Sequence, residues 1–333
     1  MRAELSKARE LGVQLLHLAQ RQDDTGLLVE AHRSLGTTAF NLGELQFSRT
    51  HLLQVMELYD PHQHQSHTFL YGQDPGMVGL SYQAMNLWIL GYPSQALQKM
   101  FEALALHQKV AHAYSLAFTL SSATRLHRLR REEHLFQKRL EASLALCTEH
   151  GFKQFWATGQ IHRGWGLTMQ GQVEEGIAQM HQGLIALRAT GAELGRPYWL
   201  MLLVEAHGIQ GDPEEGLTLL TEALMLMDTT GERWYEPELY RLKGVLLVQQ
   251  SSDNHAEAES SFHKAIAIAQ SQQAKSWELR ATTSLAKLWQ QQGKRQEAYD
   301  LLAPVYGWFT EGFDTADLID AKALLDELSE GSP

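Results

Sequence analysis

Apolar residues recur along most of the chain at the three- and four-residue spacing of an amphipathic helix. No stretch shows the alternation of Val, Ile and Thr that favours a strand. The clearest unit is 199–224, where Gly211 and Pro213 separate two apolar helices. Small residues at Gly216 and Ala223 on the second helix allow the two helices to approach closely. The pattern therefore predicts a helical hairpin at this place.

The break between two helices returns at a regular interval. It falls at five positions, each 40 residues after the one before: Gly91, Arg131, Gly171, Gly211 and Ser251. Self-similarity at such a period indicates stacked repeats, because one hairpin cannot bury its apolar face alone. The predicted fold class is all-α, a right-handed superhelical solenoid of about seven hairpins. Their expected ranges are 30–59, 77–107, 111–150, 155–190, 197–229, 237–272 and 276–310.

The segments outside the hairpins have separate predicted roles. Residues 2–20 form an amphipathic helix that caps the N-terminal end, and 313–328 form a C-terminal capping helix with an acidic outer face. The polar stretch 60–76, DPHQHQSHTFLYGQDPG, is predicted to be an inserted loop. Residues 329–333 are expected to be a disordered tail. The chain from 1 to 328 is thus predicted to be a single solenoid.

Composition argues against several classes of protein. The chain carries 28 Lys and Arg against 39 Asp and Glu, a net charge of −11, which opposes binding to nucleic acid. No segment reaches the length of an apolar transmembrane helix, and the N-terminus lacks the apolar core of a secretion signal, so no membrane association is expected. Cys147 is the only cysteine. It follows the apolar rhythm of its helix and is predicted to be a buried structural thiol in a reducing cytoplasm.

The hairpins resemble tetratricopeptide repeats in an elongated form, since Leu35, Gly36 and Gly43 lie where such a repeat has its Leu-Gly pair and turn glycine. Three segments of the sequence resemble the C-terminal repeat region of large bacterial signalling proteins: FLYGQDPG (69–76), LYRLKG (239–244) and LLAPVYGWFTEGFDTADL (301–318). In those proteins a class III adenylate/guanylate cyclase domain, or another effector, precedes a STAND-type signal-transduction ATPase, and the repeats follow. The likeness covers nearly the whole chain. It departs at Arg131 and Ser251, which replace the turn glycine, and at Gly164-Trp165, where a bulky side chain lies near the tight helix crossing.

The sequence carries none of the catalytic motifs of such a protein. It lacks a GxxxxGK[ST] phosphate loop, an acidic pair on a strand and a Gly-rich dinucleotide turn. We therefore expect no enzyme activity and no cofactor in this chain. The resemblance places any ATPase or cyclase activity in domains outside it. It also implies that the repeats form a sensory or regulatory arm that contacts a protein or peptide partner, or the upstream domains of the parent chain.

In tetratricopeptide arrays the first helix of each hairpin lines the concave face. Large aromatic and arginine side chains on such a face typically anchor protein or peptide partners. The candidates placed on or near this face are Asn86, Arg125, Arg128, His162, Trp165, Trp199, Glu205 and Arg241. The alternative is that Trp165 and Trp199 belong to the hairpin core and the arginines are solvated. For the set as a whole we expect a binding groove.

The inserted loop offers two further candidate sites. Residues 74–76, Asp-Pro-Gly, carry a turn signal, and the functional alternative is that Tyr71 and Asp74 face the groove and hold a ligand. Imidazole is a good ligand for zinc or nickel, and the loop carries three histidines: His62, His64 and His67. The loop supplies no cysteine and no evident fourth ligand. Solvated surface histidines are therefore the simpler interpretation.

A basic cluster lies at the end of another predicted helix, within RLHRLRREEH at 125–134. Arg128, Arg130 and Arg131 could take an acidic peptide or a phosphate. Glu132 and Glu133 follow at once and can pair with these arginines across a helix turn. Mutual neutralisation at the junction between two helices is the expected arrangement.

The physics of stacked hairpins favours binding over chemistry, because stacking creates an extended concave surface. The predicted function is a non-catalytic protein- or peptide-binding scaffold. The alternative is a small-molecule-sensing domain with an aromatic-lined pocket near Tyr71, Tyr82 and Trp88. A closed aromatic pocket would favour that alternative, and an open groove would favour a protein partner. A homodimer through the N-terminal helix is also expected, with a contact patch of Leu5, Leu11 and Leu15.

Overall fold

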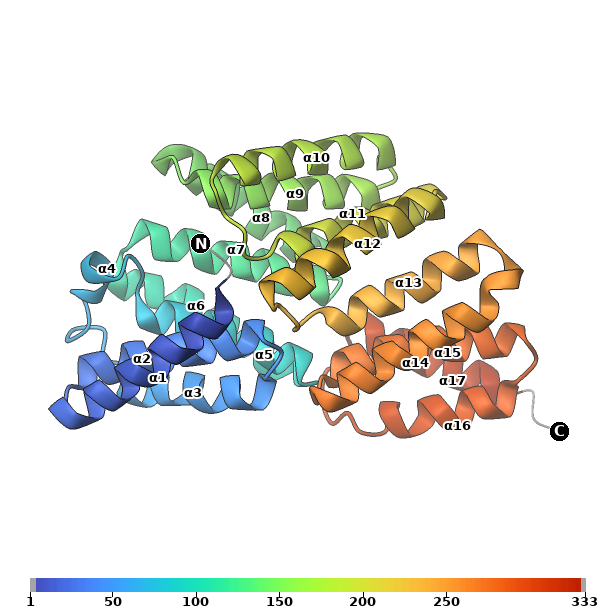
Figure 1. The fold of residues 1–333 in the computed structure, drawn as a ribbon, viewed down its shortest axis with the longest axis horizontal. Coiled ribbons are helices and arrows are strands. Elements are labelled where there is room, and N and C mark those ends of the chain that lie inside the picture. The colour runs from blue at the N-terminus through green and yellow to red at the C-terminus, as the bar shows by residue number, and fades with distance from the viewer. Residues whose placement is uncertain (1–3, 331–333) are drawn as a thin grey trace.

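The computed structural model describes residues 4–330, which form 17 α-helices and one 3₁₀-helix (η1) and no strand (Figure 1). The first nine helices are α1 (Leu5–Gln22), α2 (Thr25–Asn41), α3 (Leu45–Leu58), α4 (His67–Leu70), α5 (Pro75–Ile89), α6 (Pro93–Val110), α7 (Ala113–Leu129), α8 (Glu133–His150) and α9 (Lys153–Met169). The others are α10 (Val173–Ala189), α11 (Arg196–Gln210), α12 (Pro213–Thr230), α13 (Glu236–Gln250), η1 (Ser252–Asn254), α14 (His255–Ser271), α15 (Lys275–Gln291), α16 (Arg295–Tyr306) and α17 (Ala316–Ser329). None of these helices is both long enough and apolar enough to span a membrane.

Successive helices pack as antiparallel hairpins, and the predicted all-α solenoid is confirmed. The hairpins are α2–α3, α5–α6, α7–α8, α9–α10, α11–α12, α13–α14 and α15–α16. At the two ends, α1 packs on α2, and α17 packs on α15 and α16. The array climbs the left of Figure 1, crosses the top and descends on the right.

The turns explain why the repeat survives where its glycine is missing. Gly91, Gly171 and Gly211 all adopt the left-handed conformation that closes a helix and starts the next. Arg131 takes the same conformation, with φ of 60°, although a side chain makes it costly. Ser251 does not, because its φ is −166° and η1 makes the turn instead. The turns spaced 40 residues apart therefore adopt two different geometries.

The inserted segment differs from the expected loop. It contains the short helix α4, and Asp74 is the N-cap residue of α5, where its Oδ1 accepts a hydrogen bond from the Met77 N–H at 2.8 Å. Pro75 and Gly76 are therefore the first residues of a helix rather than a turn. The left-handed glycine lies at Gly72 instead, with φ of 76°. The predicted tail begins with Ser329, which closes α17, while 331–333 lie outside the described residues.

The tightest crossing in the array lies between α9 and α10. A Cβ atom built on Gly164 would stand 2.4 Å from the carbonyl oxygen of Gly176, and one on Gly176 would stand 2.5 Å from the Gly164 oxygen. Neither backbone can yield without separating the helices. Glycine at both positions is thus what lets this hairpin pack as closely as it does. The neighbouring Trp165 points away from the crossing into a cavity described below.

The solenoid closes on itself. Helix α5 contacts α15, where the Ser276 hydroxyl donates to the carbonyl oxygen of Trp88. The Arg233 N–H donates to the Asn41 carbonyl oxygen at 2.7 Å, and Arg280 Nη2 donates to the Leu129 carbonyl oxygen at 2.6 Å. Each contact joins the N-terminal half of the array to the C-terminal half. The concave face is consequently enclosed rather than open at the side.

Candidate binding cavities inside the closed solenoid

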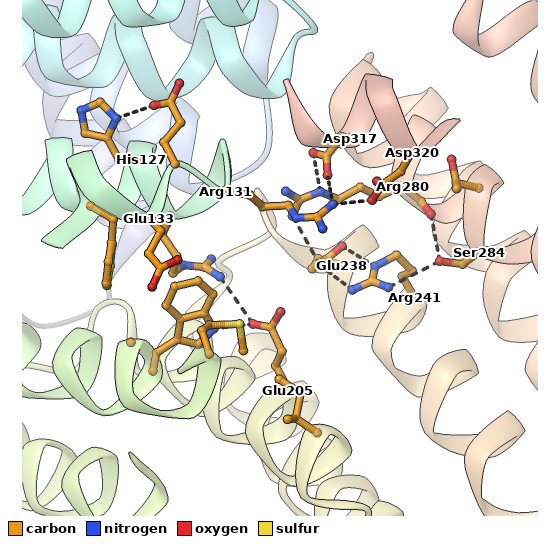
Figure 2. A pocket seen from close by; sticks show the side chains of 18 of the residues that line it. His127, Arg131, Glu133, Glu205, Glu238, Arg241, Arg280, Ser284, Asp317 and Asp320 are labelled. Atoms are coloured by element: carbon orange, nitrogen blue, oxygen red, sulfur yellow. Dashed lines mark hydrogen bonds and ion pairs between the residues drawn. The ribbon is translucent and has the colours of Figure 1, made fainter. Parts of the chain in front are cut away.

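A cavity of about 440 Å³ lies inside the closed array, between the ends of α7, α9 and α11 on one side and α13, α15 and α17 on the other (Figure 2). Its lining combines apolar and charged side chains. The apolar side chains are Phe136, Trp165, Met169, Ile209 and Leu279. The charged side chains are Arg128, Arg131, Glu132, Glu133, Glu205, Glu238, Arg241, Arg280, Lys287, Asp317 and Asp320.

Most charges on the C-terminal wall neutralise one another. Figure 2 shows Arg131, Arg241 and Arg280 interleaved with acidic side chains. Arg241 Nη2 pairs with Glu238 Oε1 and Arg280 Nε with Asp317 Oδ2, each at 2.8 Å. Burial alone would raise the pKa of Glu238, but Arg241 and Arg280 outweigh burial and hold that pKa below its ordinary value. This wall is an ion-pair network, so most of its charged groups already have partners.

A second network joins three of the predicted site residues on the opposite wall. The Trp165 Nε1–H donates to Glu205 Oε2 at 2.8 Å, and Arg128 Nη1 lies 3.5 Å from the same oxygen. Arg128 also donates from Nε and Nη2 to the Tyr198 hydroxyl oxygen, at 3.2 and 3.0 Å. Arg128, Trp165 and Glu205 therefore form one connected unit. Arg241, the fourth predicted residue at this cavity, belongs to the facing wall.

Four lining side chains are uncommitted, which means here that they are either charged without an ion-pair partner or apolar and exposed. Within residues 4–330, Glu133 and Lys287 have no ion-pair partner and both are exposed, and Glu133 accepts a long hydrogen bond of 3.4 Å from Gln170 Nε2. Met169 and Ile209 are apolar, yet 40% and 48% exposed inside a concave site. These four were missed from the sequence. The sequence contained a signal for two of them, since Met169 and Ile209 both lie two residues before a turn glycine of the 40-residue repeat.

A second cavity, of about 90 Å³, contains three more of the predicted residues. Tyr82, Arg125 and Trp199 all line it. Five further aromatic side chains belong to its wall: Phe40, Phe118, Phe155, Tyr198 and Trp234. The Tyr198 ring contacts both arginines, since the guanidinium carbons of Arg125 and Arg128 lie 4.8 and 5.5 Å from its centre. The concave face is thus divided into a larger charged cavity and a smaller aromatic one.

Two predicted residues lie in the core rather than on the lining of either cavity. His162 is 1% exposed between the rings of Phe136 and Trp199, and burial, with Arg125 and Arg128 nearby, lowers its pKa well below the usual value. Asn86 is also buried, and its side-chain amide donates to the Leu45 carbonyl oxygen at 2.9 Å. Their placement on the binding surface was wrong. Both occupy inward-facing helix positions that neighbouring helices cover completely.

Tyr71 and Asp74 also lie away from both cavities, so the expectation that they face the groove was wrong. Asp74 is fully buried, and its carboxylate caps α5 and accepts a hydrogen bond from the Tyr59 hydroxyl at 2.7 Å. Tyr71 is 43% exposed in the inserted segment, with its ring edge-on to His67. Trp88 is buried edge-on against Trp277 at the closing contact. Tyr71, Tyr82 and Trp88 therefore do not share a pocket.

The three histidines of the inserted segment have separate environments. His67 Nδ1 lies 2.8 Å from Glu30 Oε1, and His64 Nδ1 lies 2.9 Å from the Asp60 carbonyl oxygen. Both rings are buried, so the expectation of solvated histidines holds for exposed His62 alone. The part of the chain that the structure describes contains no group of three His, Cys, Asp or Glu residues arranged to hold a metal ion.

The basic cluster after α7 is only partly neutralised by its own glutamates. Arg130 Nη2 pairs with Glu132 Oε1 at 2.7 Å, and His127 Nδ1 lies 2.6 Å from Glu132 Oε2. Arg131 instead reaches Asp320 of α17 at 2.5 Å, a contact across the closed ring. Glu133 pairs with none of them among the described residues. Local pairing was therefore the right expectation for Arg130 and the wrong one for Arg131.

Two other expectations concern single residues. Cys147 is 1% exposed, and burial raises the pKa of its thiol, which fits a structural role. On α1, Leu5 is buried within the chain, so it does not belong to an exposed contact patch. Leu11 is 54% exposed and Leu15 is half-buried. A homodimer through the outer face of α1 stays a prediction, now without Leu5.

Glu232, on the wall of the smaller cavity, makes the stability of the fold depend on pH. Its side chain is 1% exposed, and burial raises its pKa from 4.5 to about 7, although the Gly195 N–H donates to it and Arg125 stands nearby. Between pH 4.5 and 7 the unfolded chain releases this proton while the folded chain keeps it. Stability is therefore lost as the pH rises through that window, by about 3 kcal/mol for this group.

We expect Glu232→Gln to remove this loss, because glutamine does not ionise. The measurement is the free energy of unfolding in urea at pH 5 and pH 8, for the native chain and the variant. The native chain should lose more stability than the variant between the two pH values. Equal losses in both chains would mean that Glu232 is already ionised at pH 5.

Comparison with known proteins supports the fold. No family model matches the chain. An uncharacterized protein of Rhizobium meliloti (strain 1021), R02095, is 25% identical over 292 residues, which are 86% of this chain and 27% of that protein. A Rap protein complexed with competence and sporulation factor has a TM-score of 0.56 at 11% identity, covering 98% of both chains. Apo RapI has a TM-score of 0.54 at 12% identity, covering 88% of this chain and 99% of RapI. The chain therefore has a tetratricopeptide-like repeat fold.

Proposed function

We propose that this chain is a non-catalytic, peptide-binding scaffold and that its larger cavity holds the peptide. The observation that carries the proposal is the exposure of Met169 and Ile209 within a cavity whose arginines and carboxylates are mostly paired. Exposed apolar side chains in a concave site lose unfavourable contact with water when a partner covers them. The paired charges fix the walls, and the uncommitted groups recognise the ligand.

The arrangement of those groups describes the peptide. Met169 and Ile209, beside Trp165, suit one large apolar side chain of the ligand. Lys287 suits an acidic group and Glu133 a basic one, since neither has an ion-pair partner among residues 4–330. With histidine neutral, the lining carries five cationic and six anionic side chains, 5 − 6 = −1. A mixed-charge peptide matches this balance better than a phosphate-rich partner does.

We further propose that the scaffold serves as a sensory or regulatory arm of a larger cytoplasmic signalling protein, with an ATPase or cyclase supplied by other domains. The chain spans about a quarter of the curated relative it matches, 27% of its length, which is consistent with such a modular context. The Rap protein of similar fold is described as complexed with competence and sporulation factor. In this proposal the ligand of the cavity is either a free peptide or a segment of the parent protein.

Selection from a random peptide library, displayed on phage and panned against the full chain, tests the proposal. A selected peptide is labelled and titrated by fluorescence anisotropy. Ile209→Ser should weaken its binding at least tenfold, roughly the effect expected from losing one well-buried aliphatic contact. The fold should be unaffected, because Ile209 is 48% exposed in the free protein.

Ile185→Ser is the matched control. Ile185 is 68% exposed on α10 and lines none of the cavities described above. We expect this variant to bind the selected peptide as the native chain does. The proposal would be contradicted if no peptide is enriched, or if Ile185→Ser and Ile209→Ser weaken binding equally.

A further inference from the structure

The smaller cavity contains a cation without a counter-ion. Arg125 comes from α7, and its guanidinium carbon lies 4.8 Å from the ring centre of Tyr198 and 5.2 Å from that of Trp199. A third ring, Trp234, lies 6.0 Å away. Within residues 4–330 no carboxylate lies within ion-pair distance of Arg125, and its buried Nε–H has no hydrogen-bond partner. The aromatic faces orient the guanidinium, yet its hydrogen-bonding donors remain unused.

Arg128, one helical turn away, shows what a satisfied arginine looks like in this fold. Its guanidinium donates to the Tyr198 hydroxyl and pairs with Glu205 at 3.5 Å. Both arginines pack on the same Tyr198 ring, but Arg128 has a hydrogen-bond partner and an ion-pair partner, whereas Arg125 has neither within residues 4–330. A buried donor without a partner is costly, whereas a donor that meets an anion forms a strong, charge-assisted hydrogen bond. The unmatched donors of Arg125 therefore favour an anionic ligand.

The walls around Arg125 define the rest of that ligand. Seven aromatic side chains line the cavity: Phe40, Tyr82, Phe118, Phe155, Tyr198, Trp199 and Trp234. The volume of about 90 Å³ holds a carboxylate and part of the group attached to it, and the rest of the ligand extends through the open side of the cavity. Glu232 is the acidic side chain of the lining, and its two oxygens lie 2.9 and 3.1 Å from the Gly195 N–H. Glu232 thus already accepts from a backbone donor, and Arg125 is the cationic side chain of the lining, with a buried Nε–H that has no partner within residues 4–330.

We propose that the smaller cavity is a second ligand site, which binds a carboxylate attached to an aromatic or apolar group. The carboxylate accepts hydrogen bonds from Arg125, and the attached group stacks among Tyr82, Phe118 and Trp199. The site is separate from the proposed peptide site, because the Arg128–Tyr198 contact stands between the two cavities. Its residues and its test are independent of the peptide-binding proposal. The ligand is either a free aromatic acid or the C-terminal carboxylate of a peptide that ends in an aromatic residue.

Calorimetric titration of the full chain with pairs of probes that match in shape and differ in charge tests this assignment. Phenylacetate is compared with phenylacetamide, and N-acetyl-Ala-Phe acid is compared with its C-terminal amide. Each acid should bind at least tenfold more tightly than its amide, since a charge-assisted hydrogen bond is about that much stronger than the neutral one it replaces. The pair that shows the larger ratio identifies the source of the carboxylate.

Substitutions test whether Arg125 is the residue that binds the carboxylate. We expect Arg125→Gln to abolish the preference for the acid, and Arg188→Gln, on an arginine of α10 that is 55% exposed, to leave it intact. Ser121→Leu provides a second route, because Ser121 lines the cavity and a larger side chain there would fill it without altering any charge. Loss of binding in Ser121→Leu supports the assignment even if Arg125→Gln fails to fold. Equal binding of acids and amides by the native chain would overturn it, as would binding of neither acid, or an unchanged preference in folded Arg125→Gln.

Discussion

Gly164→Ala should destabilise the protein by about 2–3 kcal/mol, although alanine is normally the better helix former. The added methyl group would lie 2.4 Å from the Gly176 carbonyl oxygen and 2.8 Å from the Met180 backbone nitrogen. Both atoms belong to the backbone of α10, so a side-chain rotation cannot relieve the overlap. The α9–α10 hairpin must separate instead. Urea-induced unfolding monitored by circular dichroism measures the loss.

Gly208→Ala provides the matched control. Gly208 also lies within a helix, α11, but the atom nearest to an added methyl group is Leu246 Cδ2 at 3.1 Å, the end of a flexible side chain. We expect this variant to be as stable as the native chain, or more stable by up to about 1 kcal/mol, because alanine reduces the freedom of the unfolded chain. A Gly164→Ala protein as stable as Gly208→Ala would show that the α9–α10 crossing is looser than described.

Arg280→Ala should open the ring. Arg280 donates to the Leu129 carbonyl oxygen at 2.6 Å, pairs with Asp317 at 2.8 Å, and lies 5.1 Å from the ring centre of Trp88. Its removal leaves a largely buried Asp317 and a backbone carbonyl group without this partner. Breaking a pair of this kind costs about 3 kcal/mol. Since the contacts with Leu129 and Trp88 join the two halves of the array, the loss should appear as a larger radius of gyration in small-angle X-ray scattering.

Arg188→Ala distinguishes ring opening from a general loss of charge. Arg188 is 55% exposed and pairs with Glu222 at 3.4 Å, between neighbouring hairpins and not across the ring. A surface pair of this kind contributes less than about 1 kcal/mol. The scattering profile of this variant should match that of the native chain. The ring-closing role of Arg280 is refuted if both variants scatter as the native chain does while Arg280→Ala remains folded.

The repeat was predictable because its signal is local and periodic. Turn glycines such as Gly171 and Gly211 recur at a fixed step, and the apolar faces between them specify hairpins that must stack. Even Arg131 obeys that step, since it adopts the left-handed conformation of the glycine it replaces. The same logic identified Arg128, Trp165, Glu205 and Arg241 as side chains of the concave face, and all four line the larger cavity.

Closure of the ring was not predictable from that periodicity. It depends on contacts such as Ser276 with Trp88 and Arg131 with Asp320, which join residues far apart in sequence. The curvature that brings those residues together is the sum of small rotations at every hairpin, and no single motif encodes that sum. For the same reason, the sequence could not show that His162 and Asn86 would be covered by neighbouring helices. The Asp-Pro-Gly sequence at 74–76 could not distinguish a turn from the start of a helix either, because proline suits both.

The most direct test of peptide binding in the larger cavity compares two double variants against one selected peptide. The first, Met169→Ser with Ile209→Ser, alters the exposed apolar groups of the cavity. The second, Met225→Ser with Ile185→Ser, alters residues of the same kinds that are more exposed and lie elsewhere, on α12 and α10. We predict that the cavity variant loses roughly a hundredfold in affinity, from two aliphatic contacts, while the other stays within about threefold of the native chain. A hundredfold loss in the second variant, with native affinity in the first, would contradict the proposal that the cavity is where this protein binds its partner.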